Sequence, residues 1–130
     1  MDCLFCKIIE GDIDSLTLYE DNAVKVIMDI KPNSNGHILI IPNRHIEDFM
    51  EIDATTVSHV YKVAKELKEY LYAALKPDGL ILRVNYGNVQ EIKHFHLHVI
   101  PVYEKEQPIY DVDAVYDKIS KQINLFNLMN

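Results

Sequence analysis

More than any other feature, three histidines at alternate positions constrain how this sequence can fold: His94, His96 and His98. Successive side chains of a β-strand point to opposite faces, and residues i and i+2 lie about 6.6 Å apart on one face. A strand through this segment therefore presents three imidazoles on one face. The apolar residues between them then point toward a core: Phe95, Leu97 and Val99. The sequence predicts such a strand over residues 94–102.

Turn-forming residues and apolar periodicity divide the rest of the chain into helices and strands. The further strands are expected at residues 17–19, 23–28, 37–41 and 80–84. The helices are expected at residues 4–10, 54–75 and 111–128. Gly11 ends the first of these helices, and Asp53 is the expected N-cap of the long amphipathic one. The order β-β-β-α-β-β-α predicts an α+β domain with an antiparallel sheet of about five strands, one long helix and a C-terminal helix.

Length and charge limit the classes of protein to consider. The chain of 130 residues has the size of one domain, so residues 1–130 are expected to fold as a single unit. Its 13 Lys and Arg against 20 Asp and Glu give a net charge of −7, which argues against nucleic acid and anionic membranes as partners. No apolar run reaches the roughly 18 residues of a membrane-spanning helix, and the first residues lack the features of a signal peptide. A cytoplasmic location is therefore expected.

The chemistry of imidazole leaves several roles open for the three histidines. Imidazole can serve as a metal ligand, a general acid or base, or a nucleophile. Its ordinary pKa of about 6.5 leaves most of it neutral at pH 7, with a free lone pair. Three imidazoles on one strand could supply a nucleophile, its orienting partner and a proton donor without a cofactor. They could also hold a catalytic zinc with bound water, or form the polar face of a half-buried strand.

Two cysteines, Cys3 and Cys6, form a C-x-x-C pair at the start of the sequence. Such a pair can be half of a tetrahedral zinc site, a redox pair, or two buried small residues. A redox pair usually lies between a strand and a helix, and no strand is expected before Cys3. A zinc site needs two more ligands, for which the histidines are the natural candidates.

The histidine segment resembles the signature of the histidine triad (HIT) superfamily, His-φ-His-φ-His-φ-φ, at every position from His94 to Ile100. Further segments are similar to family blocks: Leu4–Ile9, Met28–Ile30, Gly36–Pro42 and Arg44–Ile46. Together they span a motif-bearing core, residues 3–102, followed by a C-terminal extension, residues 103–130. The resemblance implies a HIT-like fold, a homodimer and the binding of purine nucleotides. It also implies hydrolysis or transfer of nucleotidyl groups at the α-phosphate, with nucleoside phosphoramidates and dinucleoside polyphosphates as candidate substrates.

The resemblance also implies roles for individual residues. His96 would be the nucleophile that forms a covalent nucleotidyl-histidine intermediate, His98 would bind the phosphate and leaving group, and His94 would orient His96. Asp29 would accept hydrogen bonds from both ribose hydroxyls, as one carboxylate can. The apolar residues that would line the base pocket are Leu4, Phe5, Ile8, Ile13 and Ile27. The loop before the histidines would contribute Asn85 and Gln90 to nucleotide binding.

Family members with an N-terminal C-x-x-C often carry zinc, and the matching ligands here are Cys3, Cys6, His45 and His94. This Cys2His2 set has the right number and types of ligand for a closed structural site. The resemblance implies that zinc would fix the His94 ring and support His96 indirectly, rather than activate water. His37 also matches a family histidine and is interpreted as a supporting or structural residue.

The loop before the histidines departs from the family pattern. Residues 85–93 are two residues shorter than usual and lack the Ala-Gly pair. Glu91 stands where many members carry Ser or Thr, and a carboxylate there repels a phosphate unless it points away or is protonated. A purine-nucleotide-binding or scaffold protein with little turnover is therefore an alternative function. A metal-dependent hydrolase is another.

Overall fold

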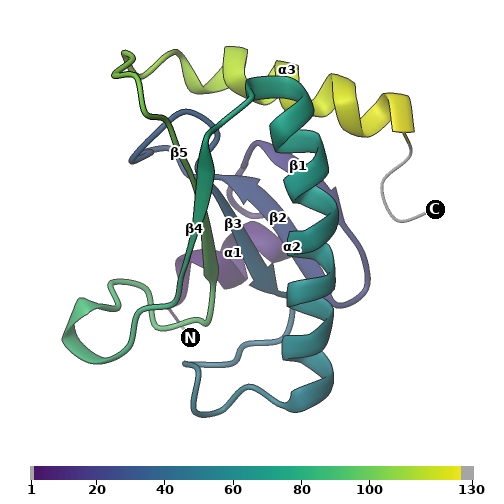
Figure 1. Ribbon diagram of the computed structural model, residues 1–130. Helices are drawn as coiled ribbons and strands as arrows, with labels where there is room; N and C mark the ends of the chain where they lie inside the picture. Colours follow the sequence, from purple (N-terminus) through teal and green to yellow (C-terminus); the bar gives the residue numbers. More distant parts are fainter. Residues whose placement is uncertain (1, 127–130) are drawn as a thin grey trace.

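The computed structural model describes residues 2–126. Its elements in chain order are α1 (Leu4–Glu10), β1 (Thr17–Glu20), β2 (Val24–Met28), β3 (Ile38–Pro42), α2 (Ala54–Leu75), β4 (Gly79–Arg83), the short 3-10 helix η1 (Gly87–Val89), β5 (Leu97–Val102) and α3 (Val112–Phe126). The strands form one antiparallel sheet in the order β1-β2-β3-β5-β4 (Figure 1). The predicted α+β fold with five strands, one long helix and a C-terminal helix is confirmed. Within residues 2–126, no helix is long and apolar enough to cross a membrane.

Alternate residues of the sheet face two different helical layers. Ile38 and Ile40 pack in the larger core, under α2 and α3, whereas Leu39 and Ile41 pack with α1 on the other face. In Figure 1, α2 lies in front of the sheet and α1 behind it. Because both faces of β3 are covered, all its residues are buried, which explains why its sequence is a continuous apolar run.

Two helix ends lie where the capping residues predict. The Asp53 carboxylate accepts a hydrogen bond from the Thr56 N–H and so satisfies a free donor at the start of α2. Gly11 ends α1 with a φ of 89°, a left-handed conformation that costs glycine little, and its N–H donates to the Ile8 carbonyl.

The histidine strand begins later than predicted. β5 covers Leu97–Val102 rather than residues 94–102, and its pairing with β3 and β4 does not extend before Leu97. The physical reason is that the preceding residues have other partners. The Phe95 N–H donates to the Ile46 carbonyl over 2.6 Å, and the His94 ring turns toward the cysteines. His96 and His98 remain neighbours, with ring centroids 4.8 Å apart.

The buried side chain of Asn35 holds the C-terminal extension to the loop before β3. Its Nδ2 donates to Gln107 Oε1 over 2.7 Å and to the Pro108 carbonyl over 2.9 Å, and its Oδ1 accepts from the Tyr110 N–H over 2.8 Å. From there α3 packs into the larger core. The helix predicted at residues 111–128 agrees with α3 as far as residue 126, and residues 127 and 128 lie outside the described part of the chain.

Candidate functional site

A cavity of about 620 Å³ lies on the α1 side of the sheet. Nine residues predicted for catalysis or nucleotide binding line it: His96, His98, Asp29, Asn85, Leu4, Phe5, Ile8, Ile13 and Ile27. The fold thus brings together the two histidines, the carboxylate predicted for the ribose and the apolar side chains predicted for the base. Neither His94 nor Gln90 is among the residues that line this cavity.

The apolar part of the cavity has a buried floor and exposed walls. Phe5, Ile8 and Ile27 belong to the smaller core under α1, whereas Leu4 and Ile13 are 45% and 38% exposed. Exposed aliphatic side chains beside a cavity can cover the faces of a flat ring and gain from removing apolar area from water. The arrangement suits an aromatic base.

The backbone fixes the tautomer of His96. Its Nδ1 lies 2.8 Å from the carbonyl oxygen of His94, and because a carbonyl only accepts, Nδ1 carries the proton. Burial lowers the pKa of His96, so the ring is neutral at pH 7. Its Nε2 therefore holds a free lone pair. The edge of Phe5 packs against the ring, with centroids 4.9 Å apart, and restricts its orientation.

A chain of hydrogen bonds fixes the tautomer of His98. The backbone N–H of Asn33 only donates, and it lies 3.0 Å from Nδ1 of His37. Burial lowers the pKa of His37, so this ring is neutral and its proton is on Nε2. That Nε2 lies 2.9 Å from Nδ1 of His98 and 3.5 Å from Oδ2 of Asp29. Nδ1 of His98 accepts, and the proton of the His98 ring is therefore on Nε2.

The Nε2–H group of His98 is ready to donate to a ligand. Within residues 2–126, this nitrogen is the one buried side-chain nitrogen or oxygen atom without a hydrogen-bond partner. Burial, followed by the neighbouring His96 and His37 rings, lowers the pKa of His98 to about 4. A buried unpaired donor costs about 1–3 kcal/mol. Because His98 lines the cavity, an oxygen atom of a bound molecule can supply the missing acceptor.

Asp29 follows directly after β2 and brings a negative charge to the same cavity. Its Oδ1 accepts from the Lys31 N–H over 2.9 Å, which fixes the carboxylate. Its Oδ2 lies beside His37, and the side chain is 20% exposed. The carboxylate keeps free acceptor positions toward the cavity, as binding of a diol requires.

Of the two residues that the resemblance assigns to nucleotide binding in the loop before the histidines, Asn85 lines the cavity and Gln90 does not. Gln90 is buried, and its Nε2 donates to the carbonyls of Glu47 and Ile92 over 2.8 and 3.1 Å, so it holds two loops together. Glu91 is exposed and lines the cavity. Sequence reasoning missed Arg83, which also lines it. Only the register of the sheet, in which Arg83 is paired with His98, could have indicated its place.

The residues predicted as metal ligands converge on one point. One ligand atom from each of Cys3, Cys6, His45 and His94 lies within 4.8 Å of the other three. Typical zinc bond lengths and a tetrahedral angle place sulfur and nitrogen ligands about 3.6 Å apart. The observed distances are 3.4 Å from Cys3 Sγ to His94 Nδ1, 3.3 Å from Cys6 Sγ to His45 Nδ1 and 3.6 Å from Cys6 Sγ to His94 Nδ1. The donor set therefore fits a tetrahedral zinc ion.

The surroundings of this cluster support the same conclusion. The Nε2–H of His94 donates to the Pro42 carbonyl over 2.8 Å, which leaves Nδ1 as the ligand atom, and such outer hydrogen bonds typically orient metal-binding histidines. Burial, followed by the Cys3 thiol, raises the pKa of Cys6 to about 11. A bound cation would oppose this shift and hold the Cys6 sulfur as the thiolate that metal binding requires.

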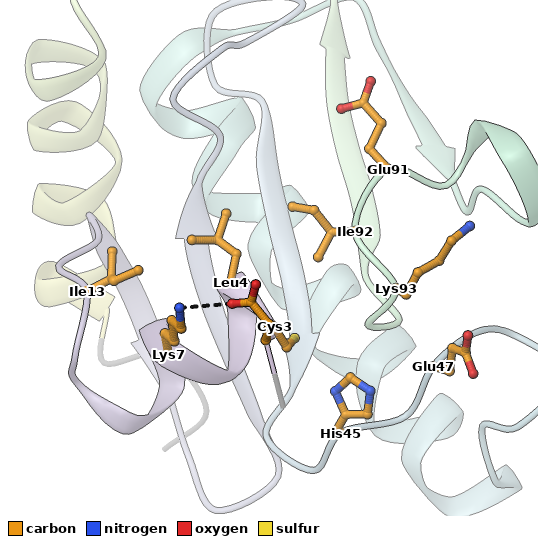
Figure 2. A pocket seen from close by; sticks show the side chains of 10 residues that line it. Cys3, Leu4, Lys7, Ile13, His45, Glu47, Glu91, Ile92 and Lys93 are labelled. Carbon is orange, nitrogen blue, oxygen red and sulfur yellow. Dashed lines mark hydrogen bonds and ion pairs between the residues drawn. The ribbon is translucent and has the colours of Figure 1, made fainter.

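A second recess of about 630 Å³ lies between α1 and the loop of residues 91–93. Figure 2 shows Lys7 and Cys3 on the α1 side of this recess, His45 below them and Lys93 on the opposite side. Lys7 forms an ion pair with Asp2 over 3.0 Å. Four of its lining residues also line the first cavity: Leu4, Ile13, Glu91 and Ile92. The two cavities therefore adjoin along these residues.

The chain is similar to known proteins over most of its length. A sequence model described as the HIT domain matches residues 10–105. An uncharacterised HIT-like protein of Methanocaldococcus jannaschii is 36% identical over an alignment of 127 residues, and the match covers 93% of this chain and 98% of that protein. A solved structure described as a hypothetical histidine triad nucleotide-binding protein from Sulfolobus tokodaii covers 96% of this chain and 94% of its own, with 31% identity and a TM-score of 0.87. A zinc-bound histidine triad family protein from Mycobacterium smegmatis covers 98% and 96%, with 28% identity and a TM-score of 0.88.

Proposed function

The chain belongs to the HIT domain family, and from that premise we propose that it is a nucleotide-binding hydrolase. It cleaves nucleoside 5′-phosphate derivatives, phosphoramidates or dinucleoside polyphosphates, at the α-phosphate through a covalent intermediate on His96. The observation that carries this proposal is the pair of fixed tautomers in one cavity. His96 has a free Nε2 lone pair, and His98 has an unpaired Nε2–H.

In the proposed complex the nucleotide fills the cavity from its apolar end to the histidines. The base lies against Leu4 and Ile13, over the floor made by Phe5. The ribose hydroxyls donate to the carboxylate of Asp29. The α-phosphate then reaches His96 and His98, which line the same cavity.

In the first step, the lone pair of His96 Nε2 forms a bond to the α-phosphorus, and the bond from phosphorus to the leaving group breaks. The leaving atom keeps the electron pair of that bond, accepts a hydrogen bond from the Nε2–H of His98 and takes a proton from solvent water. His96 becomes cationic, and its Nδ1–H bond to the His94 carbonyl stabilises this charge. In the second step, a water oxygen bonds to phosphorus, the P–N bond breaks and its electrons return to His96. The proton that this water loses passes to solvent, and His98 keeps its Nε2–H throughout.

We propose zinc as the ion that Cys3, Cys6, His45 and His94 hold, on the basis of their tetrahedral arrangement. Its contribution when bound is to crosslink α1 to the segment before β5. The residue that connects this cluster to the chemistry is His94, whose ring is a ligand and whose carbonyl binds His96. The role of this zinc is structural.

A second candidate function is nucleotide binding with little turnover, and the observation that favours it is Glu91. This carboxylate lines the cavity and is exposed, and it takes part in no ion pair among the described residues. Its charge would oppose the approach of a phosphate.

Intact-protein mass spectrometry after incubation with adenosine 5′-phosphoramidate distinguishes the two functions. The hydrolase predicts release of AMP and a nucleotidyl adduct on His96, which accumulates in a His98→Asn variant because the intermediate breaks down slowly. The His96→Asn variant is the control and should give neither. If the wild type binds the nucleotide but forms neither adduct nor AMP, the binding function replaces the hydrolase.

We further propose that the protein is a cytoplasmic single-domain homodimer joined through β4. This strand lies at the edge of the sheet, and its Ile81 and Leu82 are 43% and 45% exposed. An exposed apolar edge readily pairs with another strand, and β4 of a second copy would cover it. Native mass spectrometry should give twice the mass of one chain, and a Leu82→Lys variant should shift the protein toward the monomer.

A further inference from the structure

Two histidines of the cavity, His37 and His98, bring no positive charge to a phosphate at neutral pH. Burial lowers the pKa of both, so their rings are neutral. The cationic residues that line the cavity are Lys31 and Arg83 among the described residues, against three carboxylates: Asp14, Asp29 and Glu91. A nucleoside monophosphate carries up to two negative charges at its phosphate. One of the two cations must therefore offset this charge.

Arg83 is the cation that lies at the histidine end of the cavity. It is the last residue of β4, and the register of the sheet pairs it with His98 on β5. Paired residues of neighbouring antiparallel strands project from the same face of the sheet, with Cβ atoms about 4.5–5.5 Å apart. The charge of Arg83 contributes to lowering the pKa of both His98 and His37. The backbone N–H of Lys31 donates to Asp29, but the charge of Lys31 is not among the causes of the pKa shifts of His98 and His37.

The guanidinium of Arg83 is available for a ligand. Arg83 is exposed, and the ion pairs of residues 2–126 do not include it. A guanidinium stays charged at every relevant pH and presents a planar fork of N–H donors that matches two phosphate oxygens. Because Arg83 is exposed and lines the cavity, its guanidinium can reach such a ligand without first breaking an ion pair within the protein.

We propose that Arg83 binds the α-phosphate of the nucleotide beside His98, through the guanidinium group that lines the same cavity from the neighbouring strand. This inference rests on the proposed nucleotide site. It also explains how a phosphate is bound next to Glu91, because Arg83 offsets the carboxylate from the β4 side of the cavity. The nucleophile and the hydrogen-bond donor stay on β5 and its preceding segment, and Arg83 on β4 supplies the positive charge.

The test is a comparison of two ligands that differ only in the phosphate, AMP and adenosine, by isothermal titration calorimetry. The variants are Arg83→Met, which removes the charge, and Arg83→Lys, which keeps it but loses the fork. Lys7→Met is the matched control, because it changes the net charge equally and lies in the neighbouring recess. Adenosine binding shows in each variant that the site is folded.

The expected result is that Arg83→Met weakens AMP binding roughly tenfold, the low end for a charged hydrogen bond because Arg83 is exposed, and leaves adenosine binding unchanged. Arg83→Lys should bind AMP with intermediate affinity, and Lys7→Met should match the wild type. An unchanged ratio of AMP to adenosine affinity in Arg83→Met would overturn the inference alone. If the wild type binds neither ligand, the proposed function fails and this inference fails with it.

Discussion

His37 is the residue whose replacement tests the hydrogen-bond chain behind His98 most directly. The His37→Leu substitution keeps an apolar side chain at this buried position but removes the Nε2–H that lies 2.9 Å from His98 Nδ1. The buried Nδ1 atom then lacks a donor, and the ring is free to move its proton from Nε2 to Nδ1. An unsatisfied buried polar atom costs about 1–3 kcal/mol, which corresponds to a rate lower by roughly 5- to 150-fold if the loss falls on the hydrogen bond from His98 to the transition state.

The assay is single-turnover formation of the nucleotidyl adduct on His96, quenched and measured by mass spectrometry at several pH values. His37→Gln is the control, because its side-chain amide keeps an N–H donor toward His98 and should recover most of the rate. The pH profile separates a positioning role from a merely structural one. Since the His37 ring helps to lower the pKa of His98, its removal should move the acidic limb of the profile from about 4 toward higher pH.

Two results would refute this reasoning. A folded His37→Leu variant with the rate and pH profile of the wild type would show that the chain from Asn33 to His98 does not set the tautomer. Equal losses in His37→Leu and His37→Gln, with the pH profile unmoved, would show that His37 acts only through packing.

Three further predictions concern the stability of the fold and the cysteine–histidine cluster. A Cβ on Gly36, whose φ is 92°, would lie 2.5 Å from Leu75 Cδ1, so Gly36→Ala should lower the free energy of unfolding by roughly 2–5 kcal/mol in urea titrations. Gly11→Ala, with a similar φ but open space around it, should cost only about 1 kcal/mol, and equal losses would contradict the clash. Cys6→Ser should lose bound zinc and melt at the temperature of the chelator-treated wild type, as measured by metal analysis and calorimetry; retained zinc would place the ion elsewhere. The pKa of His98 is lowered to about 4, so this ring is protonated in the unfolded chain before it is protonated in the folded chain as the pH falls. At most about 3 kcal/mol of stability present above pH 6.5, less after solvent screening of this half-buried ring, should disappear toward pH 4, and this loss should be missing in His98→Asn.

Local patterns predict most of this fold. Apolar runs and turn residues indicate all five strands, Asp53 indicates the start of α2, and Gly11 indicates the end of α1. Each of these signals acts between residues a few positions apart, so it can be recognised in the sequence without knowledge of the tertiary structure. The cysteine–histidine cluster could be predicted only because the resemblance connects Cys3 with His45 and His94, which lie 42 and 91 positions further along the chain.

Partners that meet only through the tertiary structure could not be predicted. The bond between His37 and His98 joins residues 61 positions apart, and the pairing of Arg83 with His98 depends on the sheet register. The alternation of histidines predicts a strand from residue 94, but the cysteines and the Ile46 carbonyl compete for this segment and delay the strand to Leu97. The alternation of side chains does not indicate how strongly these other partners compete with strand pairing.

His94 takes part in the site through two chemically independent portions of one residue. Its ring joins the cysteine cluster, whereas its backbone carbonyl, which any amino acid would supply, accepts the Nδ1–H of His96. A lineage can therefore replace the side chain at this position together with both cysteines and still retain the reactive tautomer. The cysteine–histidine cluster and the tautomer of His96 can therefore be separated by mutation, although one residue takes part in both.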